Sequence, residues 1–212
     1  EQNTEFHNEL DLTKTLRSHI ASDVALWVEK LIDGDISSAN ELSIKIREQG
    51  FELYITRDLE QAKSYAMGRY EGQNEKRFGL IASSKSNILP AFGIDNDFMT
   101  TRRFRGGPWF NDPPNSVKSC CAFNSVATEF QCQGLELDLP IVCWDDDLLW
   151  DDGWKTKKTT RRSNLKDPHQ RRLDSYRVLL SRGRDGIIIF VPPLEKLDST
   201  YKVLVKSGLK IL

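Results

Sequence analysis

Apolar residues follow two different spacings along the chain, and each spacing predicts one kind of secondary structure. Where they recur every three or four residues they predict amphipathic helices, at 18–33, 36–49, 58–70, 167–180 and 194–205. Where they form short continuous runs they predict buried strands, at 51–56, 77–83, 122–128, 139–144 and 187–191. Strands that alternate with helices indicate an α/β domain whose sheet is mostly parallel.

Two stretches interrupt this alternation. Residues 84–118 contain Gly, Pro, Asn and Arg with little periodicity, which predicts a long loop or insertion. Residues 145–166 are polar and strongly charged, so we expect a second, charged loop there. A chain of 212 residues suits one large domain, and we predict a single domain over 1–212.

Charge and cysteine content narrow the function classes only slightly. The 30 basic and 31 acidic residues nearly balance, so only local patches could point to nucleic acid. The longest apolar runs, such as 187–191, fall far short of the roughly 20 residues that span a bilayer, and no membrane partner is expected. The four cysteines form no C-x-x-C pair and have no His at ligand spacing, which predicts a reducing, cytoplasmic location without disulfides or zinc.

A glycine turn joins the strands predicted at 122–128 and 139–144. Its sequence is Gln133-Gly134-Leu135-Glu136-Leu137-Asp138. A Gly flanked by polar groups between two strands indicates a tight turn at a sheet edge, and such turns in parallel sheets lie where ligands bind. An ordinary connecting turn explains the same residues equally well.

A second charged turn closes the helix predicted at 167–180. Its sequence is Ser181-Arg182-Gly183-Arg184, and the strand at 187–191 follows. A basic last turn complements the helix dipole and Gly183 can cap the helix, which accounts for one basic residue without any function. It does not account for two arginines, whose planar guanidinium groups suit a phosphate that is being transferred.

Together with a third run, these turns resemble the second RecA-like domain of superfamily 1 helicases, and more closely the Schlafen group 3-like DNA/RNA helicase domain family. Residues 12–18 are similar to the element that opens this half of the motor, residues 129–138 to motif V, and residues 176–184 to motif VI. The resemblance spans nearly the whole chain. It implies a RecA-like fold with a mostly parallel sheet flanked by helices.

The resemblance also implies roles for individual residues. Arg17 and Arg182 would contact the γ-phosphate of ATP, and Glu136 would hold the ribose. Gln133 and Gly134 would couple the nucleotide to the nucleic-acid track, although many helicases of this superfamily have Lys at the position of Gln133. The positions further expected to contact ATP or the nucleic acid are Arg184 and Thr128, respectively.

The chain lacks the run G-x-x-x-x-G-K-[ST], which cradles the phosphates of ATP and places Mg²⁺. The strand at 139–144 with the following aspartates looks superficially like a Walker B strand, but it comes after motif V and has no phosphate loop before it. The resemblance therefore implies a P-loop in an upstream domain outside this chain. We expect the chain alone not to hydrolyse ATP, and to supply arginine fingers to that domain.

Arginines lie next to aromatic residues in the predicted insertion. The basic residues are Arg102, Arg103 and Arg105, and Trp109 follows them. This mixture suits single-stranded DNA or RNA, because bases stack on rings while arginines meet phosphates. A surface insertion anchored by Trp109 is the alternative. A second basic run over 155–172 is either a solvated face or a contact with the nucleic-acid backbone.

Two other functions remain open at this point. The acidic residues of the charged loop are Asp145, Asp146, Asp147, Asp151 and Asp152. They could hold a divalent cation, but an exposed acidic loop pinned by tryptophans is the expectation. A metal-dependent nuclease would use Glu136, Asp138 and Asp145 as ligands, with Lys155 near the scissile phosphate. A non-catalytic module of RecA-like shape that binds single strands is the other alternative.

Overall fold

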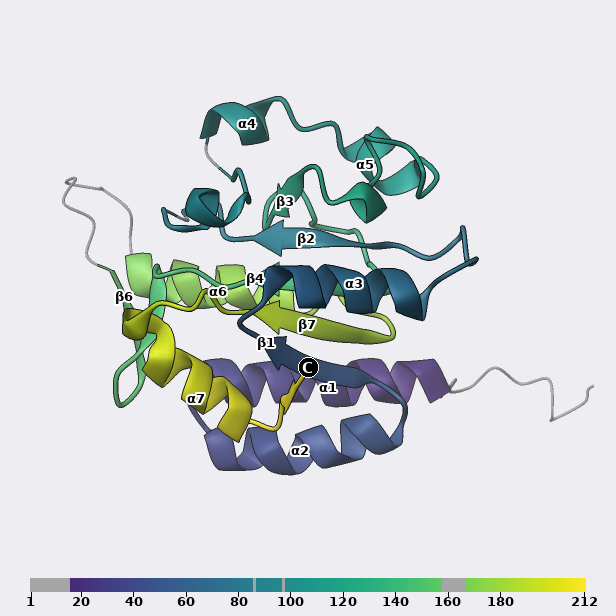
Figure 1. The fold of residues 1–212 in the computed structure, drawn as a ribbon. Helices are drawn as coiled ribbons and strands as arrows, with labels where there is room; N and C mark the ends of the chain where they lie inside the picture. Colours follow the sequence, from purple (N-terminus) through teal and green to yellow (C-terminus); the bar gives the residue numbers. More distant parts are fainter. Residues whose placement is uncertain (1–15, 86, 97, 158–166) are drawn as a thin grey trace, which may run out of the picture.

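The centre of the molecule is a six-stranded sheet in which every strand pairing is parallel, in the order β3-β2-β4-β7-β1-β8. The computed structural model describes residues 16–85, 87–96, 98–157 and 167–212 (Figure 1). The strands are β1 (Glu52–Thr56), β2 (Phe78–Ala82), β3 (Val126–Thr128), β4 (Leu139–Cys143), β7 (Gly186–Phe190) and β8 (Lys210–Ile211). This sheet confirms the predicted α/β class and is consistent with a RecA-like fold.

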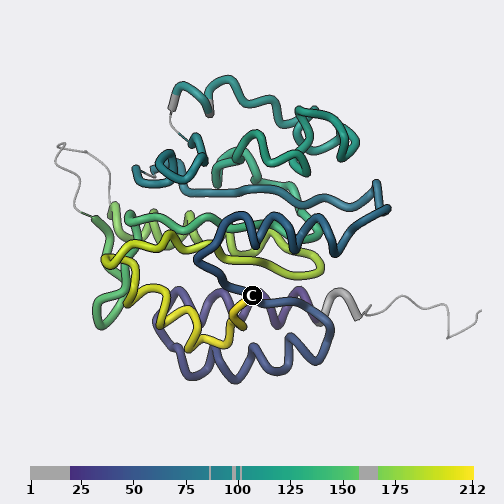
Figure 2. The backbone as a smooth tube through the Cα atoms, viewed as in Figure 1, coloured from purple at the N-terminus to yellow at the C-terminus, as the bar shows by residue number. Residues whose placement is uncertain are grey.

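Helices cover the sheet on both faces. They are α1 (Leu16–Asp33), α2 (Ile36–Glu48), α3 (Leu59–Arg69), α6 (Pro168–Leu180) and α7 (Asp198–Lys206), the last preceded by η4 (Glu195–Leu197). In Figure 1, α3 crosses in front of the sheet and α6 lies behind it. The backbone trace in Figure 2 shows α1 and α2 as neighbouring helices joined by a short turn, and α1 also contacts α6.

The local sequence explains where these elements begin and why the sheet is buried. Asp35, Asp58 and Asp167 each cap the helix that follows, accepting a backbone hydrogen bond from Ser38, Glu60 and Gln170 respectively. In β2, β4 and β7 every residue is buried. Strands covered on both faces need continuous apolar runs rather than alternation, and that is the pattern the sequence has.

The two stretches that interrupt the sequence pattern contain short elements of their own. Within 84–118 the structure has η2 (Leu89–Phe92), α4 (Phe98–Arg102) and α5 (Gly106–Asn111), and η3 (Cys120–Ala122) follows. The charged stretch contains an antiparallel hairpin of β5 (Leu148–Trp150) and β6 (Trp154–Thr156), which sequence reasoning missed. The part of the basic run at 158–166 lies outside the described residues.

All strands run in the same direction, so the sheet has two distinct edges. We call the end where the strands begin the amino edge and the end where they finish the carboxyl edge. In Figure 1 the arrowheads point left, to the carboxyl edge, and α1 starts on the opposite side, by the amino edge. Among the described residues, none of the helices has the length and apolar composition that crossing a bilayer requires.

Candidate functional site

The glycine turn and the arginine turn meet at the amino edge. The backbone N–H of Leu137 donates to the carbonyl of Arg182 over 2.9 Å, and the N–H of Arg184 donates to the carbonyl of Leu137 over 2.8 Å. The N–H of Asp185 then donates to the carbonyl of Asp138 over 2.9 Å. Leu137 and Gly183 form a parallel bridge outside the named strands. The backbone ladder of β4 and β7 thus continues through both turns and holds them together.

Gly183 occupies the most crowded point of this ladder. A Cβ placed there would lie 2.1 Å from the carbonyl oxygen of Gly186, a distance that no real side chain tolerates. The glycine is therefore required by the close approach of two backbone segments and does not cap α6, whose last turn ends at Ser181. Gly134 has a φ of 76°, which fits the tight turn predicted from the sequence.

Arg182 is held in one orientation by three protein acceptors. Its Nε donates to the carbonyl of Val178 (3.0 Å), its Nη1 to the carbonyl of Leu135 (3.3 Å) and its Nη2 to the hydroxyl of Ser181 (2.9 Å). Leu135 belongs to the glycine turn, so the side chain joins the two turns as the backbone does. A guanidinium has more N–H donors than these contacts use, which leaves Arg182 able to bind an anion.

Arg184 and Glu136 form an exposed ion pair beside Arg182. The Nε of Arg184 lies 2.8 Å from Oε2 of Glu136, and the two side chains are 46% and 57% exposed. The hydrogen bond to Glu136 raises the pKa of Arg184. Gln133 and Gly134 are also exposed. The structure therefore brings the predicted positions of motifs V and VI to one surface.

Arg17 lies in the first turn of α1, and its side chain is outside the described residues. The start of α1 lies by the amino edge (Figure 1). Further along the helix, a groove of about 320 Å³ is lined by Ala25, Val28 and Glu29 of α1 and by Arg177 and Ser181 from α6. Helix α1, which carries Arg17, and α6, which ends just before Arg182, are thus neighbours.

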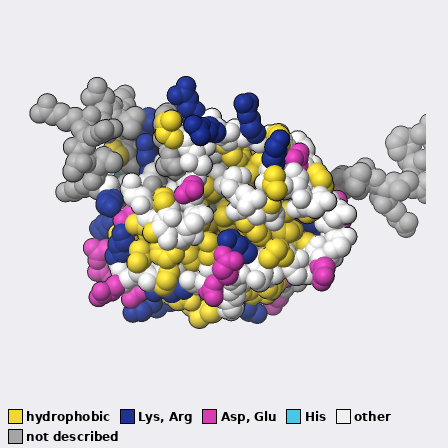
Figure 3. Space-filling model, turned by 45° about the horizontal axis from the view of Figure 1, so that its top comes forward, with side chains coloured by type: hydrophobic (Ala, Val, Ile, Leu, Met, Phe, Trp, Pro, Cys, Tyr) yellow, Lys and Arg dark blue, Asp and Glu magenta, His cyan; other side chains and the backbone are white. Residues whose placement is uncertain are grey.

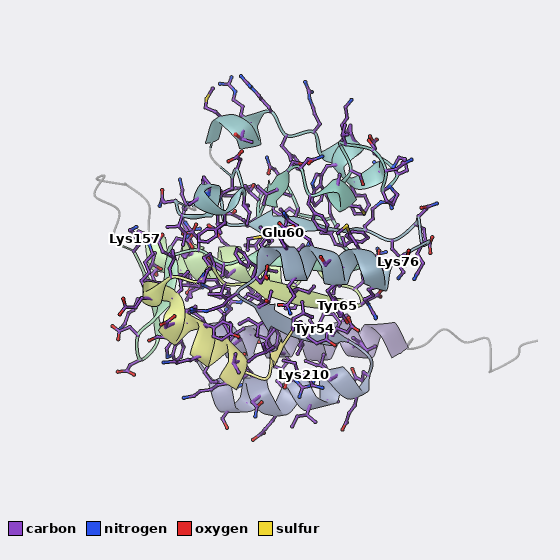
Figure 4. All side chains as sticks on the ribbon, in the orientation of Figure 1. Tyr54, Glu60, Tyr65, Lys76, Lys157 and Lys210 are labelled. Carbon is purple, nitrogen blue, oxygen red and sulfur yellow. The ribbon has the colours of Figure 1, made fainter. Side chains whose placement is uncertain are left out.

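Lys76 and Tyr70 bind acidic residues at the amino edge, and neither was predicted from the sequence. The Nζ of Lys76 lies 3.1 Å from Oδ1 of Asp138 and 2.7 Å from Oδ2 of Asp185, and Figure 4 labels Lys76 at this end of the molecule. The hydroxyl of Tyr70 donates to Asp185 over 2.9 Å. Burial alone would raise the pKa of Asp185, but these hydrogen bonds lower it. Both donors lie far upstream of the motifs, so no local pattern signals them.

The acidic cluster at the carboxyl edge is buried where an exposed loop was expected, so that expectation is wrong for its first three members. Asp145, Asp146 and Asp147 are 0%, 2% and 5% exposed, while Asp151 and Asp152 are exposed. Three groups contact the carboxylate of Asp147, namely Tyr176 Oη (2.7 Å), Ser83 Oγ (2.6 Å) and Arg172 Nη1 (2.9 Å). Arg172 and Tyr176 lie on α6. Their contacts with Asp147 explain why part of this charged run is buried. The tryptophans do anchor this region, since Trp154 donates to the carbonyl of Leu31 over 2.8 Å.

The neighbouring carboxylates of Asp145 and Asp146 have opposite pKa shifts. Burial raises the pKa of Asp145 to about 7, and the adjacent carboxylates of Asp146 and Asp147 add to the shift. Burial opposes ionisation of Asp146 as well, but hydrogen bonds from Asp145, Lys196 and Lys157 lower its pKa to about 2. The carboxylate of Asp146 thus stays charged, while Asp145 holds its proton more easily.

The geometry contradicts the predicted ligand set of a metal-dependent nuclease. Asp138 starts β4 at the amino edge, whereas Asp145 follows β4 at the carboxyl edge. Seven residues of extended chain separate them by about 23 Å. In the part of the chain that the structure describes, no group of three His, Cys, Asp or Glu residues is arranged to hold a metal ion. The proposed ligands do not converge, and Lys155 lies exposed on β6.

Glu129 links three segments at the carboxyl edge. It is 4% exposed, directly after β3. Its carboxylate accepts hydrogen bonds from the N–H (2.7 Å) and hydroxyl (2.9 Å) of Ser84 and from the hydroxyl of Ser175 (3.2 Å). Ser84 follows β2 and Ser175 lies on α6. The run that resembles motif V is therefore fastened to the loop that leads into the insertion and to α6, the helix that precedes Arg182.

The predicted nucleic-acid residues fall into two groups. Arg102, Arg103 and Arg105 are exposed. Trp109 is only 1% exposed, and its Nε1 donates to the carbonyl of Ser125 over 3.5 Å. Its ring is part of the core and is not open to a base, so the interpretation of Trp109 as an anchor is the correct one. Thr128 is also buried, at 3% exposure.

A six-stranded parallel sheet flanked by helices defines an α/β domain, and its architecture is consistent with the RecA-like class. The family model of the Schlafen group 3, DNA/RNA helicase domain matches residues 1–193. The chain therefore belongs to this family, which indicates a helicase-like function on nucleic acid. No curated protein and no solved structure matched the chain.

Proposed function

We propose that this chain is the second RecA-like motor domain of an ATP-dependent DNA/RNA helicase or translocase of superfamily 1. In this role it supplies Arg182 to ATP that is held by a P-loop domain outside this chain. One observation carries the proposal. Arg182 is fixed between the end of α6 and Leu135 of the glycine turn, on a surface where Arg184 and Glu136 are exposed.

The residues at the amino edge fit a nucleoside triphosphate. ATP supplies a phosphoryl group for transfer to water, and cations must offset the charge on its phosphates. Arg182 and Arg184 offer guanidinium groups at this edge, and Arg17 is proposed as a further arginine from the start of α1. Glu136 binds Arg184 through Oε2 alone, which leaves Oε1 to accept a hydrogen bond from a ribose hydroxyl. The phosphate loop and the Mg²⁺ site would come from the other domain.

Arg182→Ala in the full-length protein tests this proposal. We expect nucleic-acid-stimulated ATP turnover to fall by about 10³-fold or more, with nucleotide binding largely retained. Arg182→Lys keeps the charge but loses the planar fork, so its turnover should lie between those of the alanine variant and the unchanged protein.

Arg69→Ala is the matched control, because Arg69 lies on α3, outside both motif-like runs, and its side chain is 33% exposed. It should leave turnover unchanged, and circular dichroism should show that all three variants fold. Full turnover in a folded Arg182→Ala variant would exclude an arginine finger at this position and would favour a binding module that only keeps the RecA-like shape.

A further inference from the structure

We propose that Cys120 and Cys121 form a redox modification site, whose two thiols close into a disulfide when the chain meets a peroxide. We call these two residues the dithiol pair. The formation of the disulfide requires neither ATP nor nucleic acid. Its effect on ATP turnover rests on the proposed function, because the pair is linked to the amino edge that carries Arg182.

The dithiol pair is adjacent in sequence, and its sulfurs are in contact. Both cysteines lie in η3, directly after its cap residue Ser119, and their Sγ atoms are 3.9 Å apart. They are free thiols, and their exposure is only 0% and 5%. The thiols of Cys132 and Cys143 instead donate to nearby backbone carbonyls. The pair is therefore the place where a disulfide can form without a rearrangement of the sheet.

The surroundings of the pair favour the thiolate of Cys121, which is the form of a thiol that attacks an oxidant. The thiol of Cys120 donates a hydrogen bond to the sulfur of Cys121 and so lowers the pKa of Cys121, and the guanidinium of Arg77 acts in the same direction. Burial instead raises the pKa of Cys132 and of Cys143. Figure 3 shows Lys and Arg side chains gathered along the upper part of the face that carries the insertion, so the segment around the pair is basic. Cys121 is therefore the attacking thiol and Cys120 the resolving one.

The reaction balances with one molecule of hydrogen peroxide. The thiolate of Cys121 attacks one peroxide oxygen, the O–O bond breaks, and a sulfenic acid forms while hydroxide leaves. That hydroxide takes up the proton that Cys121 released when it ionised. The sulfur of Cys120 then attacks the sulfur of Cys121, the S–O bond breaks, and the departing hydroxide takes the proton of Cys120. The two sulfurs lose two electrons in total, and the peroxide is reduced to two molecules of water.

A disulfide between sequence neighbours is strained. Adjacent Cα atoms lie about 3.8 Å apart, whereas those of most disulfides are separated by roughly 4.4–6.8 Å. Strain makes a disulfide easier to reduce, and strained disulfides are the labile and regulatory ones. The disulfide of the pair is therefore one that glutathione reopens, as a reversible switch requires.

Cys121 is the partner that moves when the disulfide closes. Cys120 packs against β2 at Gly79, where an added Cβ would lie 2.7 Å from the Cβ of Cys120 and 3.2 Å from the ring of Trp109. This packing leaves Cys120 no space to shift toward the sheet. The two sulfurs must approach from 3.9 Å to about 2 Å, so Cys121 covers most of the difference.

The movement of Cys121 reaches the amino edge through Lys76. In the reduced chain the thiol of Cys121 donates to the carbonyl of Lys76 over 3.6 Å, and a disulfide has no proton to donate. The side chain of Lys76 binds Asp138, the last residue of the glycine turn, and Asp185, which follows the arginine turn. Oxidation therefore removes one of the contacts that position the residue joining the two turns.

Peptide mapping by mass spectrometry tests the disulfide in the folded chain. The chain is treated with hydrogen peroxide and then alkylated under denaturing conditions. We expect the peptide with the dithiol pair to have lost two hydrogen atoms and to escape alkylation, whereas Cys132 and Cys143 are alkylated. Glutathione should restore alkylation of the pair. A sulfinic acid at Cys121, or alkylation of both members of the pair, would overturn the proposal.

Two serine variants assign the roles within the pair. Cys120→Ser removes the resolving thiol, so Cys121 should accumulate as a sulfenic acid that dimedone labels. Cys143→Ser is the matched control, because it also replaces a buried thiol, and its disulfide should form as in the unchanged chain. Equal dimedone labelling of the unchanged chain and Cys120→Ser would mean that the second thiol does not resolve the first.

Hydrogen exchange tests the link to the amino edge without relying on the proposed function. The N–H groups of Leu137 and Arg184 join the two turns, and they should exchange severalfold faster in the oxidised chain. The N–H of Val191, which donates to Thr56 at the carboxyl edge, should exchange as before. Unchanged exchange at Leu137 and Arg184 once the disulfide has formed would overturn the link through Lys76.

ATP turnover of the full-length protein separates the two proposals. If both hold, turnover should fall on oxidation and recover with dithiothreitol, and the double variant C120S/C121S should not respond to peroxide. If Arg182→Ala leaves turnover unchanged while the disulfide still forms, the proposed function fails and the modification site stands. If Arg182→Ala abolishes turnover and no disulfide forms, the modification site fails alone.

Discussion

The two edges of the sheet hold similar charged residues in opposite surroundings. At the amino edge Arg184 and Glu136 form an ion pair in solvent, with side chains about half exposed. The two turns that carry them are joined by backbone hydrogen bonds. At the carboxyl edge Arg172 and Asp147 pair at 2.9 Å with side chains only 12% and 7% exposed. An ion pair between an arginine and an acidic residue therefore has different consequences at the two edges. Exposed charges are free to meet a ligand, whereas buried ones are committed to the fold.

The largest expected effect is the difference in stability lost when each of these two ion pairs is broken. Arg172→Met removes the cation from Asp147 and leaves its buried carboxylate uncompensated, which should lower the free energy of unfolding by about 3–5 kcal/mol. Arg184→Met is the matched change at the amino edge and should cost less than about 1 kcal/mol, because water screens that pair. Urea denaturation of both variants measures the contrast. Equal losses would show that the two edges do not differ as described.

A second prediction concerns the backbone of the amino edge. Gly183→Ala would force a Cβ against the carbonyl of Gly186, at 2.1 Å in the present geometry. We expect a loss of about 3 kcal/mol, at the upper end for overpacking, because backbone rather than a flexible side chain is in the way. Gly68→Ala is the control. Gly68 lies within α3 with nothing near its Cβ position, so this change should be neutral or slightly stabilising in thermal unfolding.

The smallest expected effect is the pH dependence of the carboxyl edge. The pKa of Asp145 is about 7 in the folded chain against 3.8 for an ordinary Asp, so the folded state favours the protonated form. Its contribution is complete below about pH 4 and is lost as the pH rises through 7. Asp146 has a pKa of about 2, so its contribution to stability is present above pH 3.8 and is lost only as the pH falls toward 2.

Asp145→Asn tests this assignment, because it mimics the protonated carboxyl. The variant should show a flatter free energy of unfolding between pH 4 and 7, measured by urea denaturation across that range. Asp174→Asn, on an exposed part of α6, should keep the slope of the unchanged protein. An unaltered slope in Asp145→Asn would mean that another group titrates there.

The sequence predicted the sheet better than its periphery, for a physical reason. Strands β4 and β7 are buried on both faces, so their apolar runs are continuous and easy to recognise. Strand β8 has two residues, both exposed, and carries no such signal. The hairpin of β5 and β6 lies in a charged stretch, and it is bonded to α1 through Trp154 and to α7 through Trp150, both partners distant in sequence.

The candidate site divides in the same way. The glycine and arginine turns could be found from the sequence, because each is a compact run that resembles a known motif. The acidic cluster was misjudged, since charge usually means exposure and nothing local shows that Arg172 and Tyr176 will meet it. Likewise, the sequence left open whether Trp109 anchors the insertion or meets a base, because its burial depends on how the insertion packs.

The connection between the two edges is bonded to the fold at both of its ends. It leaves β3 at Thr128 on the carboxyl edge and enters β4 at Leu139 on the amino edge, and Glu129 and Leu137 fasten its two ends. A five-residue strand spans about 16 Å, and the connection must cover a comparable distance with a tight turn at Gly134. One connection therefore carries exposed Phe130 near its start and, before β4 begins, the carbonyl of Leu135 that binds Arg182, so a single segment of chain contributes to both edges.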